Sequence, residues 1–270
     1  WFLQMAATAV LALPAVTVLL SDEDKTFPHL ENRGAIWAGG AGLAPAAWLA
    51  GGRVSGREGH EGGAPDASPW VPDDPSIPRL AVAVRECRGC ELWEHATQAV
   101  LSSGAAGARF MLVGEQPGDQ EDREGLPFVG PAGRVLAEAM DAAGLDASDA
   151  YLTNAVKHFR YEQRGKRRIH QAPELRHLVA CHPWLEAELV VVDPRVVVCL
   201  GASAGRAVLG RPVRIGAERG HVLDGPGGRA ALITTHPSAV LRRRSSGDYE
   251  GAFGLFVADL AAAVRAGKAA

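Results

Sequence analysis

The 270-residue sequence lacks several features that would assign it to a common class. It has no excess of positive charge, because its formal net charge is −3, so its overall charge gives no indication of a nucleic-acid partner. It shows no internal repeat and holds only four cysteines. It also lacks a clean run of about 20 apolar residues of the kind that spans a membrane. Residues 5–20 are apolar apart from two threonines, but Pro14 interrupts them.

The first 72 residues differ in composition from the rest. No basic residue precedes the apolar run, which leads directly into the acidic residues 22–24, whereas a secretory signal begins with positive charge. The chain begins with Trp1, so we interpret this part as a fragment or mis-set start upstream of a soluble protein, in preference to a membrane anchor. Residues 38–68 are rich in Gly, Ala and Pro and are typical of a linker. We expect residues 1–72 to be dispensable and residues 73–270 to form the functional domain.

The remainder of the chain alternates between strand-like and helix-like segments. Its short apolar runs have the length of buried strands and lie at residues 109–113, 150–153, 195–200 and 230–234. Pro131 can open a helix that runs through Met140, and Pro173 can open another that carries Leu185 and Leu189. This alternation predicts an α/β fold with a mainly parallel, four-stranded central sheet.

Distinctive residues follow each of the four predicted strands. They are the Gly-Glu-Gln-Pro-Gly loop at 114–118, Asn154, the Gly-Ala-Ser triplet at 201–203 and the His-Pro-Ser triplet at 236–238. Ligands of open parallel sheets bind at the carboxyl ends of the strands. We therefore expect these motifs to share one cleft.

Three of these side chains suit the recognition of a flat polar ring. Phe128 on a rigid loop can stack on such a ring, although a core position would explain it equally. Asn154 offers both a donor and an acceptor, which matches the O4 and N3–H edge of uracil, although an Asn at a strand end is often a turn former. His236 could hydrogen-bond a developing uracil anion or simply cap a helix.

Two local clusters of basic residues could engage phosphates although the net charge is near zero. Between residues 158 and 170 only Glu162 opposes five basic residues, which are Arg160, Arg164, Lys166, Arg167 and Arg168. Residues 166–171 then form a basic loop that ends in His170-Gln171, and a second cluster lies at residues 242–244. The candidate DNA contacts are Lys166, Arg167, Arg168 and Arg242. A solvated basic loop is the alternative.

Together these segments resemble the family 4 uracil-DNA glycosylases over about residues 85–265. The shared pieces are the Cys-Arg-Gly-Cys motif at 87–90, the loop at 114–118, Phe-Val-Gly-Pro-Ala-Gly at 128–133, Thr-Asn-Ala-Val-Lys at 153–157, Ala-Cys-His-Pro-Trp-Leu at 180–185 and the triplet at 236–238. The resemblance implies a three-layer α/β sandwich that excises uracil from DNA. It also implies a pocket for a flipped-out uracil built from Phe128, Asn154 and His236.

Two departures from the family 4 pattern resemble the UdgX branch, whose members become covalently attached to uracil-containing DNA. Gln116 stands where family 4 enzymes usually have a small residue, and the loop at 166–171 is an insertion typical of that branch. The resemblance implies that His170 is the nucleophile, attacking the sugar C1′ after uracil leaves. Glu115 is our candidate to hydrogen-bond the imidazole N–H and fix its tautomer. We group Glu115, Gln116, His170 and His236 as the catalytic residues.

The four cysteines raise the question of a metal site. Cys87 and Cys90 form a Cys-x-x-Cys pair, a good metal clip in a reducing compartment. Cys199 lies in a predicted central strand, where a buried cysteine is a common small hydrophobe. Family 4 enzymes carry a ligand cysteine where this chain has His158. The resemblance therefore favours a [4Fe-4S] cluster held by Cys87, Cys90, His158 and Cys181, with Cys199 in place of His158 as the alternative. A zinc site with these ligands is chemically acceptable.

Three functional hypotheses follow. The leading one is a single-turnover glycosylase that is trapped on the DNA through His170. The second is an ordinary hydrolytic family 4 enzyme, and the third is a uracil-DNA or single-strand binding module without turnover. The expected partner is uracil-containing DNA, with single strands preferred. We further expect a cytoplasmic monomer that does not bind membranes.

Overall fold

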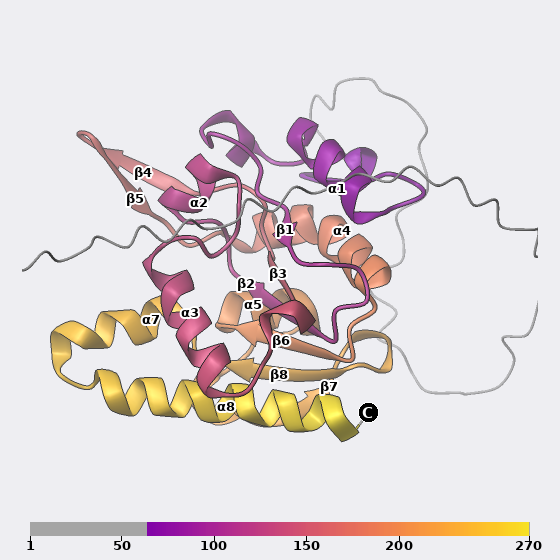
Figure 1. Cartoon of the computed structure of the whole chain (residues 1–270). Coiled ribbons are helices and arrows are strands. Elements are labelled where there is room, and N and C mark those ends of the chain that lie inside the picture. Colours follow the sequence, from indigo (N-terminus) through magenta and orange to yellow (C-terminus); the bar gives the residue numbers. More distant parts are fainter. Residues whose placement is uncertain (1–63, 270) are drawn as a thin grey trace, which may run out of the picture. The chain divides into compact units, whose positions relative to one another are not determined.

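The computed structural model describes residues 64–269, and its centre is a six-stranded sheet with the order β1-β3-β2-β6-β8-β7 (Figure 1). The strands are β1 (Ser102–Ser103), β2 (Phe110–Gly114), β3 (Ala150–Asn154), β6 (Val196–Leu200), β7 (Val222–Asp224) and β8 (Ala230–Thr234). The four inner strands run parallel, whereas β1 and β7 are short antiparallel edge strands. The predicted α/β class and four parallel strands are confirmed. The two edge strands are additions that the sequence did not indicate.

The inner strands are buried on both faces, which explains why they read as continuous apolar runs. In β6 all five residues are buried, and they alternate between two cores. Val197 and Cys199 pack on one side with α4 and α5, while Val198 and Leu200 pack on the other with α3 and α8. The sheet is therefore the middle of three layers.

Helices cover both faces of the sheet (Figure 1). One face carries α1 (Ile77–Ala83), α4 (Leu175–Val192) and α5 (Ala202–Leu209), and the other carries α3 (Pro131–Ala142), α7 (Pro237–Arg242) and α8 (Tyr249–Ala269). The short helices α2 (Asp119–Glu124) and α6 (Ile215–Glu218) follow β2 and precede β7. The 3-10 turns are η1 (Ser68–Trp70), η2 (Val84–Glu86), η3 (Glu91–Glu94), η4 (Ala147–Asp149), η5 (Pro226–Gly228) and η6 (Arg243–Ser246).

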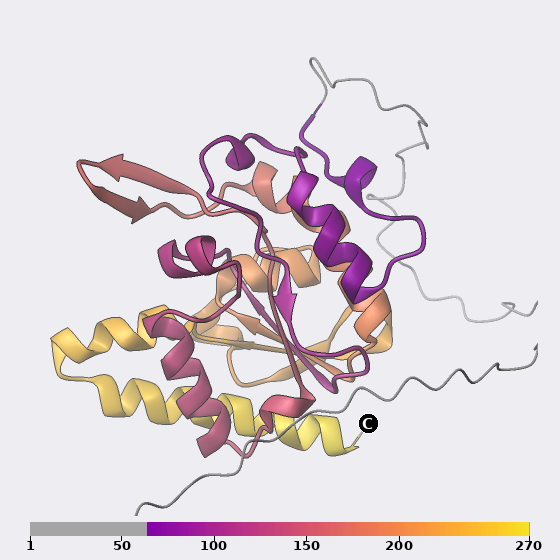
Figure 2. The same ribbon diagram turned by 45° about the horizontal axis from the view of Figure 1, so that its top comes forward.

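The predicted basic loop is instead a β-hairpin that projects from the body of the domain (Figures 1 and 2). Strands β4 (Tyr161–Arg164) and β5 (Arg167–His170) pair in antiparallel register and form a separate two-stranded sheet. Gly165 has a φ of 59°, the left-handed conformation that a two-residue hairpin turn requires. The run of charged residues concealed this pairing. The consequence is that His170 stands at the base of the hairpin, opposite Tyr161.

We expected the functional domain to begin after residue 72. Of the segment before that boundary, the structure describes only residues 64–72. Residues 1–63 lie outside the described residues, so the interpretation of that part stays a prediction. Ala67, however, is 1% exposed, and its N–H donates to the Ala180 carbonyl of α4 at 2.9 Å. The packed domain therefore already includes residues shortly before Asp73. Among residues 64–269, no helix is long and apolar enough to cross a membrane.

Candidate functional site

A cavity of about 370 Å³ opens at the carboxyl ends of the parallel strands. Its lining residues come from the loops after β2, β3 and β8 and from the hairpin, and they are Gln116, Gly118, Glu121, Phe128, Ala132, Asn154, His170, His236, Ser238 and Arg242. Six predicted site residues are thereby brought together, namely Gln116, Phe128, Asn154, His170, His236 and Arg242. Segments more than a hundred residues apart converge here because parallel strands end at the same edge.

Gly114 lies next to two of the residues that line the cavity, Asn154 and Phe128. This glycine ends β2 directly opposite Asn154, the last residue of β3. A Cβ atom on Gly114 would lie 2.3 Å from Asn154 Oδ1 and 2.8 Å from Phe128 Cζ. The carboxamide and the phenyl ring can therefore approach one another only because residue 114 has no side chain. Asn154 is 3% exposed and lines the cavity, so its desolvated amide is available to a ligand that binds there.

His236 presents a neutral imidazole to the cavity. It is the N-cap of α7, and its Nδ1 accepts a hydrogen bond from the Ser238 N–H at 3.2 Å. Burial, together with the neighbouring His170 and Arg242, lowers the pKa of His236 to about 4. Because Nδ1 is an acceptor and the ring is neutral, the proton sits on Nε2. This residue can therefore donate a hydrogen bond to an anion without carrying a charge itself.

His170 reaches the cavity from the hairpin and meets the loop that follows β2. Its Nε2 lies 3.0 Å from Gln116 Nε2 and 3.6 Å from Glu115 Oε1. The second distance is too long for a hydrogen bond, so the expected bond from the imidazole N–H to Glu115 is absent in this state. Burial lowers the pKa of His170, Glu115 opposes this shift, and Arg242 reinforces it. The imidazole is thus neutral near pH 7, with 51% of the side chain exposed.

Gln116 connects the hairpin to the parallel sheet through its carboxamide. Its Nε2 donates to the carbonyls of Arg160 and Gln171, at 3.2 and 2.9 Å, and its Oε1 accepts the Arg160 N–H at 3.1 Å. Arg160 and Gln171 flank the two ends of the hairpin. Gln116 therefore sets the position of the strand that carries His170.

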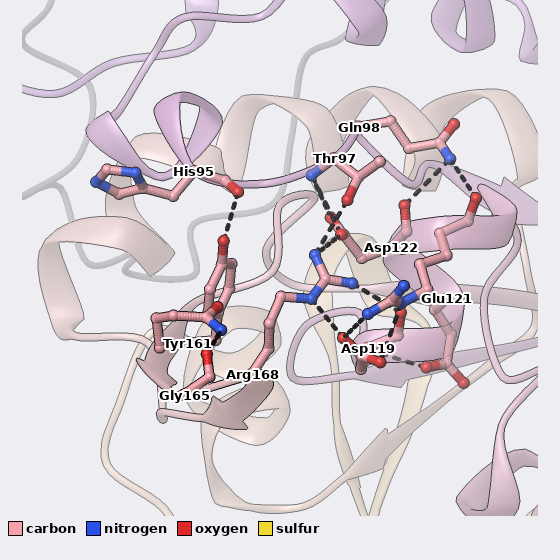
Figure 3. A network of polar contacts seen from close by, with 12 residues as sticks. His95, Thr97, Gln98, Asp119, Glu121, Asp122, Tyr161, Gly165 and Arg168 are labelled. Carbon is pink, nitrogen blue, oxygen red and sulfur yellow. Dashed lines mark hydrogen bonds and ion pairs between the residues drawn. The ribbon is translucent and has the colours of Figure 1, made fainter.

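Arg168 points inward, contrary to its predicted role as a DNA contact. Figure 3 shows its guanidinium between Asp119 and Asp122 of α2, with Thr97 beside it. Its side chain is 10% exposed and also lies over the rings of Phe159 and Tyr161. Because the guanidinium hydrogen-bonds to Asp119, Asp122 and Thr97, it holds the hairpin against α2 and does not face a phosphate backbone outside.

The other predicted DNA contacts remain on the surface. Lys166 and Arg167 are exposed at the tip of the hairpin, and Arg242 lies at the rim of the cavity, 3.3 Å from Ser238 Oγ. A basic surface next to a base-sized cavity suits a nucleic-acid ligand.

Comparisons with known proteins agree with this geometry. Residues 101–261 match the family model described as the uracil DNA glycosylase superfamily. That range contains every strand of the parallel sheet and all residues of the cavity. The chain belongs to the uracil-DNA glycosylase superfamily.

Individual members of this glycosylase superfamily extend the likeness. A type-4 uracil-DNA glycosylase of Thermotoga maritima is 37% identical over 164 residues, which cover 60% of this chain and 82% of the relative. A type-4 enzyme of Pyrobaculum aerophilum is 32% identical over 174 residues, covering 62% and 85%. A type-5 enzyme of the same organism is 31% identical over 150 residues, covering 50% and 63%.

Three of the four cysteines of this glycosylase gather between η2, η3 and α4. The Trp184 Nε1–H donates to Cys87 Sγ and the Lys157 N–H donates to Cys181 Sγ, each at 3.3 Å. Burial raises the pKa of Cys90 to about 11, and the neighbouring Cys87 adds to the rise. Both Cys87 and Cys90 also raise the pKa of Cys181, which places the three thiols within electrostatic reach of one another.

His158 and Cys199 are the two candidates for the fourth ligand, and both are buried. Within residues 64–269, no group of three or more acidic, histidine or cysteine side chains is arranged to hold a metal ion. His158 is buried, and burial lowers its pKa to about 4, with Arg88 adding to the shift. Cys199 is buried in β6, and burial alone raises its pKa to about 12. The donor chemistry of Cys87, Cys90 and Cys181 fits an iron–sulfur cluster, while Cys199 serves the apolar core.

Sequence reasoning missed two members of the site. Ser203 donates a short hydrogen bond to Glu115 Oε2, which leaves Oε1 facing His170. Glu121 lines the cavity from α2. The triplet containing Ser203 was noticed as a strand-end motif, but no sequence signal pairs it with Glu115. Glu121 lies in a helix rich in acidic residues, a composition that is typical of a solvent-exposed helix.

Proposed function

We propose that this protein excises uracil from DNA and that His170 then captures the deoxyribose C1′, leaving the protein covalently attached to the DNA. The observation that carries this proposal is that a neutral, half-exposed imidazole and the uracil-reading residues line one cavity of about 370 Å³. A nucleophile held in the same cavity as the base-binding residues competes well with water.

Uracil selection is assigned to Asn154 and Phe128, which both line the cavity. Asn154 can donate to O4 and accept from N3–H, whereas cytosine presents the opposite pattern. The ring of Phe128 lies against Asn154 across Gly114, where a flipped-out base can stack on it. Only a base with the hydrogen-bonding edge of uracil then satisfies the desolvated amide.

Bond cleavage is assigned to His236. When the C1′–N1 bond breaks, its electron pair goes to uracil N1 and the negative charge spreads over the ring. The Nε2–H of neutral His236 can donate to this anion, and a preformed donor of this type stabilises the transition state more than the ground state. A sugar with oxocarbenium character remains, and its C1′ is electrophilic.

Capture of the sugar is assigned to Nε2 of His170. Its Nε2, which lies 3.0 Å from Gln116 Nε2 in the resting state, supplies the lone pair that forms the new bond to C1′. The alkylated ring loses its Nδ1 proton to solvent, and the released uracil anion gains one. While the ring is positive, Glu115 at 3.6 Å stabilises it. The product has no carbonyl that water could attack, so the adduct persists and each protein molecule reacts once.

Hydrolysis with turnover is the alternative, and the likeness to type-4 uracil-DNA glycosylases favours it. In that case water attacks C1′ and His170 only contacts the DNA. A binding module without turnover is less well supported, because a neutral histidine donor and a half-exposed nucleophile serve no purpose in binding alone.

The decisive experiment compares the wild type with His170→Ser on a labelled, single-stranded uracil oligonucleotide. The wild type should give one heat- and SDS-resistant adduct per protein on a denaturing gel, and His170→Ser should release uracil with turnover and leave an alkali-labile strand. His95→Ser removes another exposed histidine outside the cavity and should behave as the wild type. Turnover without an adduct in the wild type supports hydrolysis. An adduct that survives in His170→Ser rules out His170 as the nucleophile.

The proposed cofactor is a [4Fe-4S] cluster held by Cys87, Cys90 and Cys181, with His158 as the fourth ligand. When bound, such a cluster cross-links the segment before β1 to α4 and supplies no step of the glycosidic chemistry. The exposed residues Lys166 and Arg167 would follow the phosphates of the bound strand.

A further inference from the structure

The carboxylate of Glu121 in α2 connects two loops that line the cavity, the loop that ends at Gly118 and the loop that carries Phe128. Glu121 Oε1 accepts the Gly130 N–H at 2.8 Å, and Glu121 Oε2 accepts the Gly118 N–H at 3.1 Å. Gly118 closes the loop that carries Glu115 and Gln116. Gly130 follows Phe128 by two residues and precedes α3. The side chain is 9% exposed, so both hydrogen bonds form away from bulk water.

Glycine at both ends of this bridge lets the carboxylate come close. A Cβ atom on Gly118 would lie 2.6 Å from Glu121 Oε2, and one on Gly130 would lie 3.0 Å from Oε1. Any larger residue at either position would push the carboxylate away from the N–H that it accepts.

The bridge lies next to a backbone conformation that needs support. Phe128 has a φ of 58°, and within the described residues only Asp193 is another non-glycine residue with positive φ. L-residues avoid this conformation unless their surroundings impose it. Two neighbours impose it here. Gly133 in the first turn of α3 leaves room for the Phe128 carbonyl, which lies 1.6 Å from the position a Cβ would take, and Glu121 anchors the chain at Gly130.

We propose that Glu121 is a positioning residue that holds Phe128 in its strained conformation, in register with Asn154, so that the ring stacks on uracil. The proposal deepens the proposed function, because it rests on Phe128 being the residue that stacks on the base. Glu121 touches neither uracil nor C1′. It acts by fixing the distance between the loop that ends at Gly118 and the loop that carries Phe128.

The test is Glu121→Gln, with Glu124→Gln as the matched control. The amide keeps the shape of the carboxylate, but its NH₂ group faces one of the two backbone N–H donors, so one of the two bonds is lost. Glu124 is exposed on the same helix. Under single-turnover conditions with saturating uracil-DNA, Glu121→Gln should release uracil roughly tenfold more slowly, with the half-saturating DNA concentration unchanged. Glu124→Gln should match the wild type.

The amount of product separates positioning from folding. If Glu121 only supported the fold, Glu121→Gln would lower the final amount of uracil released per protein and leave the rate constant of the active fraction unchanged. That result overturns the proposal. Free uracil is scored in parallel with the adduct, so the absence of an adduct in the wild type refutes trapping by His170 and leaves the measurement on Glu121 valid.

A double-mutant cycle identifies the residue through which Glu121 acts. In a Phe128→Ala background the ring to be positioned is gone, so Glu121→Gln should cost little further rate, at most about twofold. Equal fold-losses in the two backgrounds would show that the two residues act independently and would refute the proposal.

Discussion

At the scale of single residues, the cavity depends on glycines, which have no side chain, as much as on the side chains that line it. Gly114 allows Asn154 and Phe128 to meet, and Gly118 and Gly130 allow Glu121 to reach the backbone of both loops. The absence of a side chain at these positions is what makes room for groups that read a ligand.

Substitution of Gly114 by Ala tests this arrangement. The added methyl would displace Asn154 Oδ1, 2.3 Å from its position, and the edge of the Phe128 ring. A displacement of about 1 Å in groups that contact the substrate commonly lowers the rate on the order of a hundredfold. We therefore expect Gly114→Ala to lower the rate of uracil release by a factor of that size. Gly216→Ala, which meets no atom within 4 Å, is the control and should be neutral. An active Gly114→Ala protein would show that the base does not bind over this residue.

Adduct formation should depend on pH through His170. Because its pKa lies below the ordinary value of 6.5, the imidazole is mostly neutral above that pH, and the rate should become flat as the pH rises further. As the pH falls below the pKa, the ring is protonated, its lone pair is lost and the rate should decline. Glu115→Gln removes a charge that raises the pKa and should move the decline to lower pH. Arg242→Gln removes one that lowers it and should move the decline upward.

Uracil release by His170→Ser provides the reference for these profiles, because any pH dependence that remains in it comes from other groups. If the decline in adduct formation shifts in the same direction in Glu115→Gln and Arg242→Gln, His170 does not control it.

At the scale of elements, the hairpin and α2 act as a pair. The hairpin contributes His170 to the cavity, yet β4 and β5 pair with no strand of the main sheet. Arg168 provides its main ionic attachment, through Asp122 of α2 at 2.5 Å and through Asp119 (Figure 3). Residues 168 and 170 are two apart in β5 and so point to the same face, which ties the position of the proposed nucleophile, His170, to that of the ion pair.

Arg168→Gln should therefore release the hairpin. The substitution leaves Asp122, which is fully buried, with only the Thr97 N–H and no cationic partner, and should destabilise the domain by about 3 kcal/mol. Amide exchange in β4 and β5 should accelerate, and adduct should form more slowly relative to uracil release. Arg167→Gln, a change at the exposed neighbouring residue, should leave amide exchange unchanged. Equal exchange in the two variants would show that Arg168 does not hold the hairpin in place.

At the scale of the whole molecule, the proposed cluster would connect segments that are far apart in the chain. Cys87 and Cys90 precede the sheet, whereas Cys181 lies in α4, and the three thiols approach one another across the core. In the same layer, Lys157 forms a fully buried ion pair with Glu188 at 2.5 Å and also donates to the Asn154 carbonyl at 2.8 Å. The cysteine region and the end of β3 that carries Asn154 are thus physically continuous.

Iron content measured on anaerobically purified protein tests the cluster. Cys181→Ala should lose iron and the broad absorption near about 400 nm, because one thiolate ligand is gone. Cys199→Ala should keep both, because this thiol packs in β6. Stoichiometric zinc in place of iron would refute the cluster. Iron loss in Cys199→Ala, with retention in His158→Ala, would identify Cys199 as the fourth ligand.

The sequence by itself determined the strands of the parallel sheet and six of the ten residues that line the cavity. Runs such as Val196–Leu200 read as buried strands because both faces of the sheet are covered. Because the inner strands run parallel, the residues that follow them lie at the same edge of the sheet. Asn154 and His236 could therefore be assigned to one site without coordinates.

Only the tertiary structure decided which partner each polar side chain takes. Arg168 and Arg167 are chemically equivalent in the sequence, yet Arg168 faces the carboxylates of α2 and Arg167 faces solvent, because alternate residues of a strand point to opposite sides. The pairing of Ser203 with Glu115 and the bridge made by Glu121 depend on loops brought together across the sheet. Such contacts leave no periodic signal in the chain, because they depend on three-dimensional distance and not on sequence spacing.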